Sequence, residues 1–272
     1  MKLSFTTLAC PEWTWERILD EAKKLGYDGI EIRGIEGEML AHRARPFLPE
    51  NQAETKEQLR RNGLSICCLG TSVMLHNAAA RETALQEGRQ AVDLAQALET
   101  PFIRVFGDRI PDGEDRETAL RRIVSGLEIL ADYCRGKQVE VLVETHGLFN
   151  RIESVDWIFE RIQQPQVGLL WDIEHTFKVY GNEVEPFYKH FRPLIRHTHF
   201  KDMKRTADGF QLCLPGEGDI DLGRIVRILR GGGYEGWLSL EWEKKHHPEL
   251  EEPEAALPAY AALMKILARD VP

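Results

Sequence analysis

Four side chains of types that commonly bind metal ions stand at the ends of four strand-like runs in the second half of the sequence. They are Glu144, Asp172, His199 and Glu241. The runs that they close are VEVLVE (139–144), VGLLWD (167–172), IRHTH (195–199) and WLSLE (237–241). Three carboxylates and one imidazole can form an octahedral site for a divalent cation. The set therefore predicts one metal site, with Mn²⁺, Mg²⁺ or Co²⁺ favoured and Zn²⁺ as an alternative.

Each of these residues also has an ordinary explanation when it is taken alone. Glu144 and Glu241 could form salt bridges or face solvent at a strand end. Asp172 could cap the segment that follows it, and His199 could be a core histidine bonded to the backbone. Together they favour a shared metal, because the carboxyl ends of barrel strands lie at one face, where catalytic groups gather.

Strand-like and helix-like segments alternate along the whole chain, and this alternation must position the four side chains. The predicted strands are 2–8, 29–33, 64–70, 102–107, 139–144, 167–172, 195–200 and 237–242. The predicted helices lie near 14–25, 53–62, 80–98, 116–135, 154–162, 183–191, 221–230 and 254–269. Eight of each predict an α/β fold, a single-domain (β/α)8 TIM barrel over residues 1–272. The competing doubly wound sheet would usually show a glycine-rich nucleotide loop after an early strand, and the sequence has none.

Local signals mark the ends of several elements. Asp115 and Ser154 are predicted N-caps, and Gly26 has the residue type expected just beyond a helix. Two insertions, 108–115 and 201–220, follow predicted strands. In a barrel both would lie on the face that holds the active site.

Charge and cysteine content narrow the class of protein. The formal net charge of −9 disfavours nucleic acid as a partner, because that binding depends on Lys and Arg. No membrane partner is expected, since no apolar run approaches the roughly 18 residues of a membrane span. The five cysteines form no C-x-x-C pair, which favours a reduced, cytoplasmic compartment. The acidic, proline-punctuated segment after residue 242 could pack on the barrel or on a second subunit of a homo-oligomer.

Five short motifs resemble those of the xylose-isomerase-like TIM-barrel superfamily, in particular its sugar (phosphate) isomerase/epimerase branch. They are ETHG (144–147), WDIEH (171–175), HTHFKD (197–202), PGEGDI (215–220) and LSLE (238–241). The resemblance covers essentially the whole chain. It implies that one divalent metal is held by the four residues named above, with His199 as the ligand in H-T-H and His197 in a structural role. It also implies that Glu144 and Glu241 remove and return the substrate proton; the alternative is that both only hold the metal.

Three residues near the predicted ligands are candidates for substrate contact. His175 stands in a D-x-x-H signature, whose histidine touches substrate oxygens in the family that this chain resembles. His146 lies two residues beyond the first predicted ligand, so a continuing strand would point both the same way. It could bind substrate or orient a ligand. Lys201 could bind substrate, support a ligand or form a solvated loop ion pair.

Two positions bear on which reaction the site performs. Arg205 matches a substrate-contacting arginine of the ketose 3-epimerases that the chain resembles. Asn150, in contrast, stands where those epimerases carry a glutamate that contacts substrate. Arg33, at the end of the second predicted strand, and Arg104, in the fourth, could bind substrate oxygens or form salt bridges. The departure at Asn150 leaves the exact reaction open.

These residues predict a divalent-metal-dependent isomerase or epimerase of a monosaccharide or cyclic polyol ketone. The cation would polarise the carbonyl and stabilise the enediolate that forms when the neighbouring proton is removed. A dehydratase of the inosose or dehydroshikimate type is the alternative, because it uses the same ligands and then expels a β-hydroxyl. An abasic-site endonuclease is less favoured, since the three-metal design of those proteins needs further histidines. A non-catalytic sugar-binding barrel is also less favoured, because the ligand set is intact.

Overall fold

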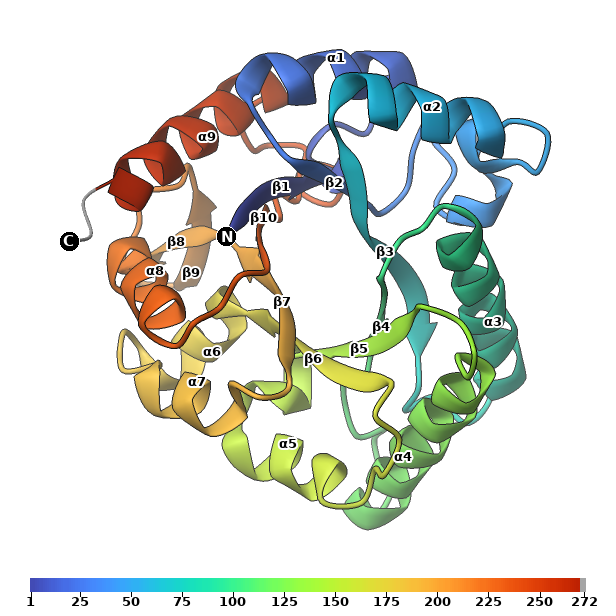
Figure 1. Cartoon of the computed structure of the whole chain (residues 1–272). Coiled ribbons are helices and arrows are strands. Elements are labelled where there is room, and N and C mark those ends of the chain that lie inside the picture. The colour runs from blue at the N-terminus through green and yellow to red at the C-terminus, as the bar shows by residue number, and fades with distance from the viewer. Residues whose placement is uncertain (270–272) are drawn as a thin grey trace.

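Eight parallel strands close into a barrel in the computed structural model, which describes residues 1–269 of the chain (Figure 1). Around the barrel the strands follow the order β1-β10-β7-β6-β5-β4-β3-β2. Their bounds are β1 Lys2–Thr6, β2 Gly29–Ile32, β3 Ser65–Met74, β4 Phe102–Phe106, β5 Glu140–Glu144, β6 Val167–Asp172, β7 Ile195–Phe200 and β10 Trp237–Leu240. The barrel closes between β1 and β10, where Lys2 lies opposite Trp237. The predicted fold is confirmed.

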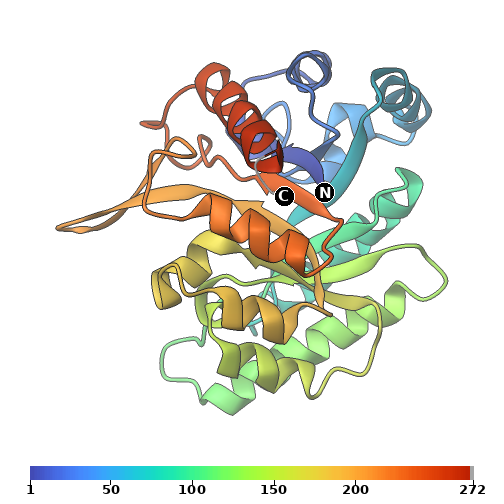
Figure 2. The ribbon, with the colours of Figure 1, turned by 60° about the vertical axis from the view of Figure 1, so that its left-hand side comes forward.

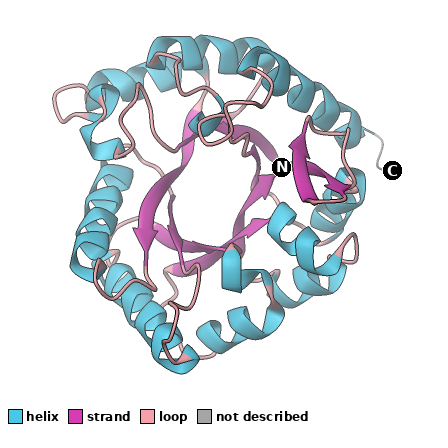
Figure 3. Cartoon of the chain, turned by 180° about the vertical axis from the view of Figure 1, so that it is seen from behind, coloured by secondary structure: helices cyan, strands magenta, loops and turns pink. Residues whose placement is uncertain are grey.

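Helices form an outer ring around the strands, which is visible from the other side of the barrel (Figure 3). Their bounds are α1 Trp15–Leu25, α2 Gln52–Asn62, α3 Arg81–Ala97, α4 Arg116–Tyr133, α5 Ile152–Phe159, α6 Ile173–Tyr180, α7 Glu185–Phe191, α8 Leu222–Gly231 and α9 Pro253–Arg269. Short 3₁₀ turns are η1 Thr7–Ala9, η2 Ala41–Arg43, η3 Arg45–Phe47 and η4 Gly147–Asn150. In α8 the buried residues are Leu222, Ile225, Val226 and Leu229, the spacing of one apolar helix face.

The helix ends follow local chemistry in two of three predicted cases. The Asp115 carboxylate accepts a hydrogen bond from the Thr118 N–H at 2.9 Å and caps α4 as predicted. Gly26 ends α1 with a φ of 76°, a conformation in which a side chain would be strained. The prediction for Ser154 is wrong: it lies inside α5, and its hydroxyl accepts a hydrogen bond from Arg116 instead.

One helix was not predicted. α6 begins directly after β6, and Asp172 is its N-cap, since Asp172 Oδ1 accepts hydrogen bonds from the N–H groups of Glu174 and His175. The ordinary explanation for Asp172, that it caps the following segment, is therefore correct, but capping uses only one of its two carboxylate oxygens. Asp172 Oδ2 remains on the other side, toward the barrel mouth.

The insertion at 201–220 forms a two-stranded antiparallel hairpin, β8 Asp202–Thr206 and β9 Gly209–Cys213. Figure 2 shows it projecting from the barrel as a light-orange arm. The buried Asp202 carboxylate holds its base, accepting hydrogen bonds from four backbone N–H groups. The donors are Met203, Gly216, Gly218 and Ile220. The Pro-Gly-Glu-Gly stretch (215–218) therefore folds around the Asp202 carboxylate.

The C-terminal segment packs on the barrel, with α9 between α1 and α8 (Figure 1). All five cysteines, which lie within residues 1–269, are buried and free of disulfides. No helix in this part of the chain is long and apolar enough to cross a membrane.

Candidate metal-dependent active site

The four predicted ligands meet at the carboxyl end of the barrel. Glu144 and Asp172 are the last residues of β5 and β6, His199 lies in β7, and Glu241 directly follows β10. His199 Nδ1 lies 3.1 Å from Glu144 Oε1 and 3.2 Å from Glu241 Oε2. It lies 3.9 Å from Asp172 Oδ2. One candidate ligand atom from each residue falls within 4.8 Å of all the others. We call these four residues the floor of the site.

The floor has the donor set that a divalent cation requires. Among the described residues, the buried atoms Glu144 Oε2 and Asp172 Oδ2 accept no hydrogen bond, and their charged contacts are Arg104 Nε at 3.4 Å and Lys201 Nζ at 3.0 Å, respectively. Such oxygens are costly unless a cation satisfies them. Burial raises the pKa of Asp172. Burial would also raise the pKa of Glu144, but the charge of Arg104, whose Nε lies 3.4 Å away, lowers it to about 2. The residues present therefore fit a bound divalent metal.

A buried lysine borders the floor. Lys201 Nζ lies 2.7 Å from Glu241 Oε2 and 3.0 Å from Asp172 Oδ2. Its side chain is only 2% exposed, so the alternative of a solvated ion pair is wrong. Burial alone would lower the pKa of Lys201, but the carboxylates of Asp172, Glu241 and Glu243 raise it well above its ordinary value. Lys201 is therefore held as an ammonium group beside the floor.

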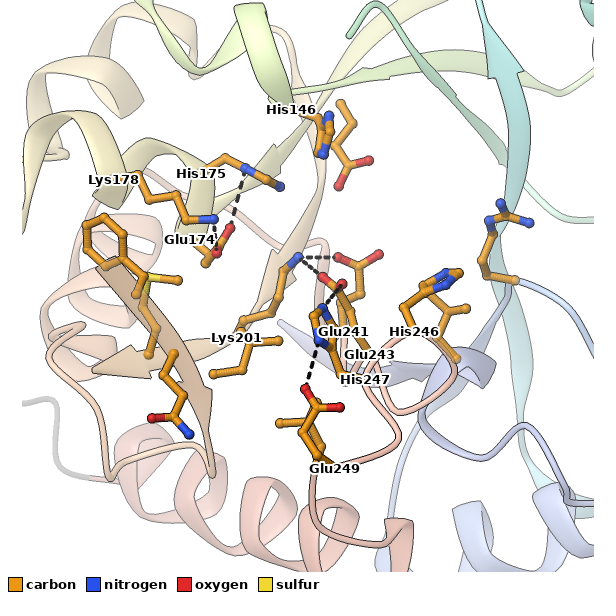
Figure 4. Close-up of a pocket in the computed structure, with 18 of the residues that line it drawn as sticks. His146, Glu174, His175, Lys178, Lys201, Glu241, Glu243, His246, His247 and Glu249 are labelled. Atoms are coloured by element: carbon orange, nitrogen blue, oxygen red, sulfur yellow. Dashed lines mark hydrogen bonds and ion pairs between the residues drawn. The ribbon is translucent and has the colours of Figure 1, made fainter. Parts of the chain in front are cut away.

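A cavity of about 520 Å³ opens over the floor (Figure 4). Glu144, Glu241 and Lys201 line it together with His146 and His175. Its volume is in the usual range for small-molecule sites. Carboxylates, an ammonium group and two imidazoles thus face one space of the size that a sugar or polyol needs.

The two histidines predicted to contact substrate lie side by side on the cavity wall. The ring centroids of His146 and His175 are 4.4 Å apart and the rings are nearly perpendicular. His146 Nδ1 lies 2.7 Å from Asp108 Oδ1, and His175 Nδ1 lies 3.4 Å from Glu174 Oε2. Burial would lower the pKa of His146, but the hydrogen bond with Asp108 raises it. Their placement agrees with a role in binding substrate, which stays a prediction.

Arg205 and Asn150 lie away from this cavity. Arg205 is on the hairpin, where its exposed guanidinium lies 5.1 Å from the ring centroid of Phe177 and 5.9 Å from that of Phe210. Asn150 ends the 3₁₀ turn η4. Neither residue is among the described residues that line the cavity. Phe210, which lies beside Arg205, does line the cavity, and the contact between Arg205 and substrate stays a prediction.

Sequence reasoning missed several polar residues of the site. On the cavity wall they are Glu174 and Glu243, and beneath the floor Glu31. Glu243 Oε1 lies 2.6 Å from Lys201 Nζ. The sequence held a signal for two of these residues. Glu243 follows a predicted ligand by two residues, and Glu31 is the single charged residue within a buried strand.

Comparisons with known proteins show the family and support the fold. A family profile described as "Xylose isomerase-like TIM barrel" matches residues 19–266. The inosose dehydratase of Salmonella typhimurium is 25% identical, over 87% of this chain and 85% of the relative. The inosose isomerase of Halalkalibacterium halodurans is 23% identical, over 92% and 90%. A crystal structure of the IOLI protein with a zinc atom has a TM-score of 0.82 at 19% identity, covering 100% of this chain and 99% of that one. At this low identity the structural likeness supports the fold alone.

Proposed function

Because the chain belongs to the xylose isomerase-like TIM-barrel family, we propose that it is a divalent-metal-dependent dehydratase of a cyclic polyol ketone of the inosose type. The observation that carries the proposal is the buried ammonium group of Lys201, 2.7 Å from Glu241 Oε2 at the cavity base. An epimerase needs groups that remove and return a proton on carbon. A dehydratase also needs a donor for the departing hydroxyl, and Lys201 supplies one. The named relatives that are inosose dehydratases support the same reaction class.

The reaction divides between the floor and the cavity wall. The floor residues would hold the cation, which would polarise the ketone and lower the cost of charge on its oxygen. Glu144 or Glu241 removes the proton on the carbon beside the ketone, since both line the cavity. Lys201 then gives a proton to the β-hydroxyl as the carbon–oxygen bond breaks, and water leaves. His146 and His175 hold the substrate hydroxyls from the wall.

Isomerisation or epimerisation is the second candidate, and one observation favours it. Glu144 and Glu241 both line the cavity, and they come from β5 and the end of β10, which β6 and β7 separate in the barrel. Two carboxylates that reach one cavity from different strands can remove a proton from one face of a carbon and return it on the other. The relative named inosose isomerase supports this alternative.

A single assay in D₂O separates the two reactions. The protein is loaded with Mn²⁺, Mg²⁺, Co²⁺ or Zn²⁺ and incubated with inososes, ketoses and dehydroshikimate, and the products are examined by mass spectrometry. Dehydration predicts loss of one water from an inosose. Epimerisation predicts uptake of deuterium without loss of water. If the metal-loaded protein leaves every compound unchanged, both functions are rejected.

Glu241→Gln supplies the matched test of the chemistry. It removes the basic carboxylate while it preserves shape, so we expect turnover to fall about 10²–10⁴-fold, the usual contribution of a general base. Glu249→Gln is the control, because Glu249 lines the same cavity but its side chain is 68% exposed. An equal loss in both variants would contradict the assigned role of Glu241.

A further inference from the structure

Glu31 lies beneath the floor and gathers three hydrogen-bond donors. It is on β2 and fully buried. Its Oε1 lies 2.9 Å from His199 Nε2, and its Oε2 lies 2.8 Å from His197 Nε2. The Ser239 hydroxyl donates to the same Oε2 at 2.9 Å. A buried carboxylate with no proton of its own can only accept, so both imidazoles must present N–H groups to it.

This arrangement determines which nitrogen of His199 is available to a metal. If Nε2 carries the proton that Glu31 accepts, a neutral His199 has its lone pair on Nδ1. Nδ1 is the atom that faces Glu144, Glu241 and Asp172. The opposite tautomer would place a proton on Nδ1, in the middle of the floor, and leave no lone pair for a cation.

We propose that Glu31 is a positioning residue that fixes the tautomer and ring orientation of His199 for metal binding. The proposal rests on the metal site of the proposed function. Carboxylates that accept the second N–H of a metal-binding histidine commonly change metal affinity by 10–100-fold when they are mutated. Here the carboxylate comes from β2, a strand that contributes no residue to the floor, so the site draws on both halves of the barrel.

His197 completes the arrangement. The buried His197 Nδ1 has no hydrogen-bond partner among the described residues, so its one contact of this kind is the Nε2–H donated to Glu31. The pair of histidines and Ser239 thus hold the carboxylate from three sides. Glu31 cannot swing away from His199 without breaking two other hydrogen bonds.

Glu31→Gln tests the proposal with little change in shape. A glutamine offers one accepting oxygen and one NH₂ group. The oxygen is best placed toward His197 and Ser239, which are two donors, and the NH₂ group then faces His199 Nε2. That contact favours the tautomer with the proton on Nδ1. We expect the affinity for Mn²⁺ or Zn²⁺, measured by competition with a chromophoric chelator, to fall roughly 10–100-fold.

Ser239→Ala is the matched control, because it removes one donor to Glu31 and leaves the contact with His199 in place. We expect its metal affinity to fall much less than that of Glu31→Gln, because Glu31 still accepts hydrogen bonds from His197 and His199. Wild-type affinity in folded Glu31→Gln, or an equal loss in both variants, would overturn the proposal. Thermal melts of both metal-free variants report whether any loss is only a loss of fold.

A second measurement needs neither metal nor turnover. In the metal-free wild type labelled with ¹⁵N-histidine, long-range ¹H–¹⁵N spectra report which ring nitrogen is protonated. We expect His199 Nε2 to carry a proton in the wild type, whether or not Nδ1, which faces Glu144 and Glu241, carries one as well. Glu31→Gln should reduce the population that is protonated at Nε2. A wild-type His199 protonated at Nδ1 alone overturns the proposal even if the dehydratase assay succeeds. If the wild type binds no divalent metal, the proposed function fails instead, and the spectra still decide the role of Glu31.

Discussion

The floor and the rim of the site are built differently. The rim is the hairpin β8–β9 and the segment 243–251, which line the cavity, together with the loop 107–115, whose Asp108 contacts His146 on the cavity wall. Each floor residue is 5% exposed or less, whereas Phe210 on the rim is 42% exposed. The floor side chains extend from the ends of barrel strands, whose register is fixed by neighbours on both sides. The rim side chains extend from a projecting hairpin and from loops (Figures 2 and 4).

Under the proposed function, this difference would separate the residues that carry the chemistry from those that select the substrate. A rigid floor can hold a cation and a base at fixed distances, which proton abstraction requires. Loops and hairpins tolerate sequence change, so a family can alter its substrates at the rim while it keeps one reaction type. Changes in the floor should therefore abolish turnover, and changes in the rim should alter affinity or stability.

Removal of metal is expected to have the largest effect. Dialysis against a chelator should abolish turnover, because the floor then lacks the charge that polarises the ketone. It should also lower stability, by about 2.7 kcal/mol relative to protein with free metal at 100 times its dissociation constant. Activity and thermal midpoint are measured before dialysis and after each of Mg²⁺, Mn²⁺, Co²⁺ and Zn²⁺ is restored. Full activity in metal-free protein would contradict the proposal that a metal bound at the floor takes part in the reaction.

Asp202→Ala should have the next largest effect, because Asp202 holds the base of the rim hairpin where it leaves the barrel. The substitution leaves four backbone N–H groups at the hairpin base without their acceptor. We expect a loss of about 2–4 kcal/mol in the free energy of unfolding and a raised KM. Asp208→Ala, at the exposed turn of the same hairpin, should change neither. Equal stability of the two variants would show that the hairpin base does not depend on Asp202.

The floor could be predicted from sequence far better than the rim. A strand buried among apolar neighbours ends at a recognisable place, so the polar residue at its end, such as Glu144 or Asp172, can be assigned to one face of the barrel. The rim is marked less clearly. The insertion 201–220 was expected on the correct face, but its hairpin depends on backbone contacts to Asp202 that no sequence pattern indicated. Helix α6, outside the rim, was missed because its cap, Asp172, was assigned to metal binding. Glu31 was missed for another reason. Its partners lie 166 and 168 residues away in sequence, and only barrel closure brings them together.

Asp108→Asn should have a moderate effect confined to one side of the rim. Asp108 has a φ of 66°, which asparagine also tolerates, so the substitution mainly removes charge. Because the Asp108 carboxylate raises the pKa of His146, the variant should titrate His146 at lower pH in NMR. A raised histidine pKa stabilises the fold below its unfolded value of about 6.5, and this is lost as pH rises through the folded pKa. The stability difference from wild type should therefore be largest at acidic pH.

A control from the same loop keeps this measurement specific. Asp112→Asn changes an exposed carboxylate of the loop 107–115 and should leave the titration of His146 unchanged. If both variants shift the pKa of His146 equally, the cause is the general charge of the loop rather than the Asp108 contact.

Arg205→Gln should have the smallest effect and tests where the rim ends. The guanidinium of Arg205 packs over Phe177 and Phe210 on the exposed hairpin, an interaction worth about 0.5–1 kcal/mol at such sites. If the hairpin keeps this position during turnover, the variant should lose only that stability and keep its kcat and KM. A large rise in KM without a matching loss of stability would mean that the hairpin folds over the substrate. The resemblance to the ketose epimerases would then have identified a contact between Arg205 and substrate that is not formed in this structure.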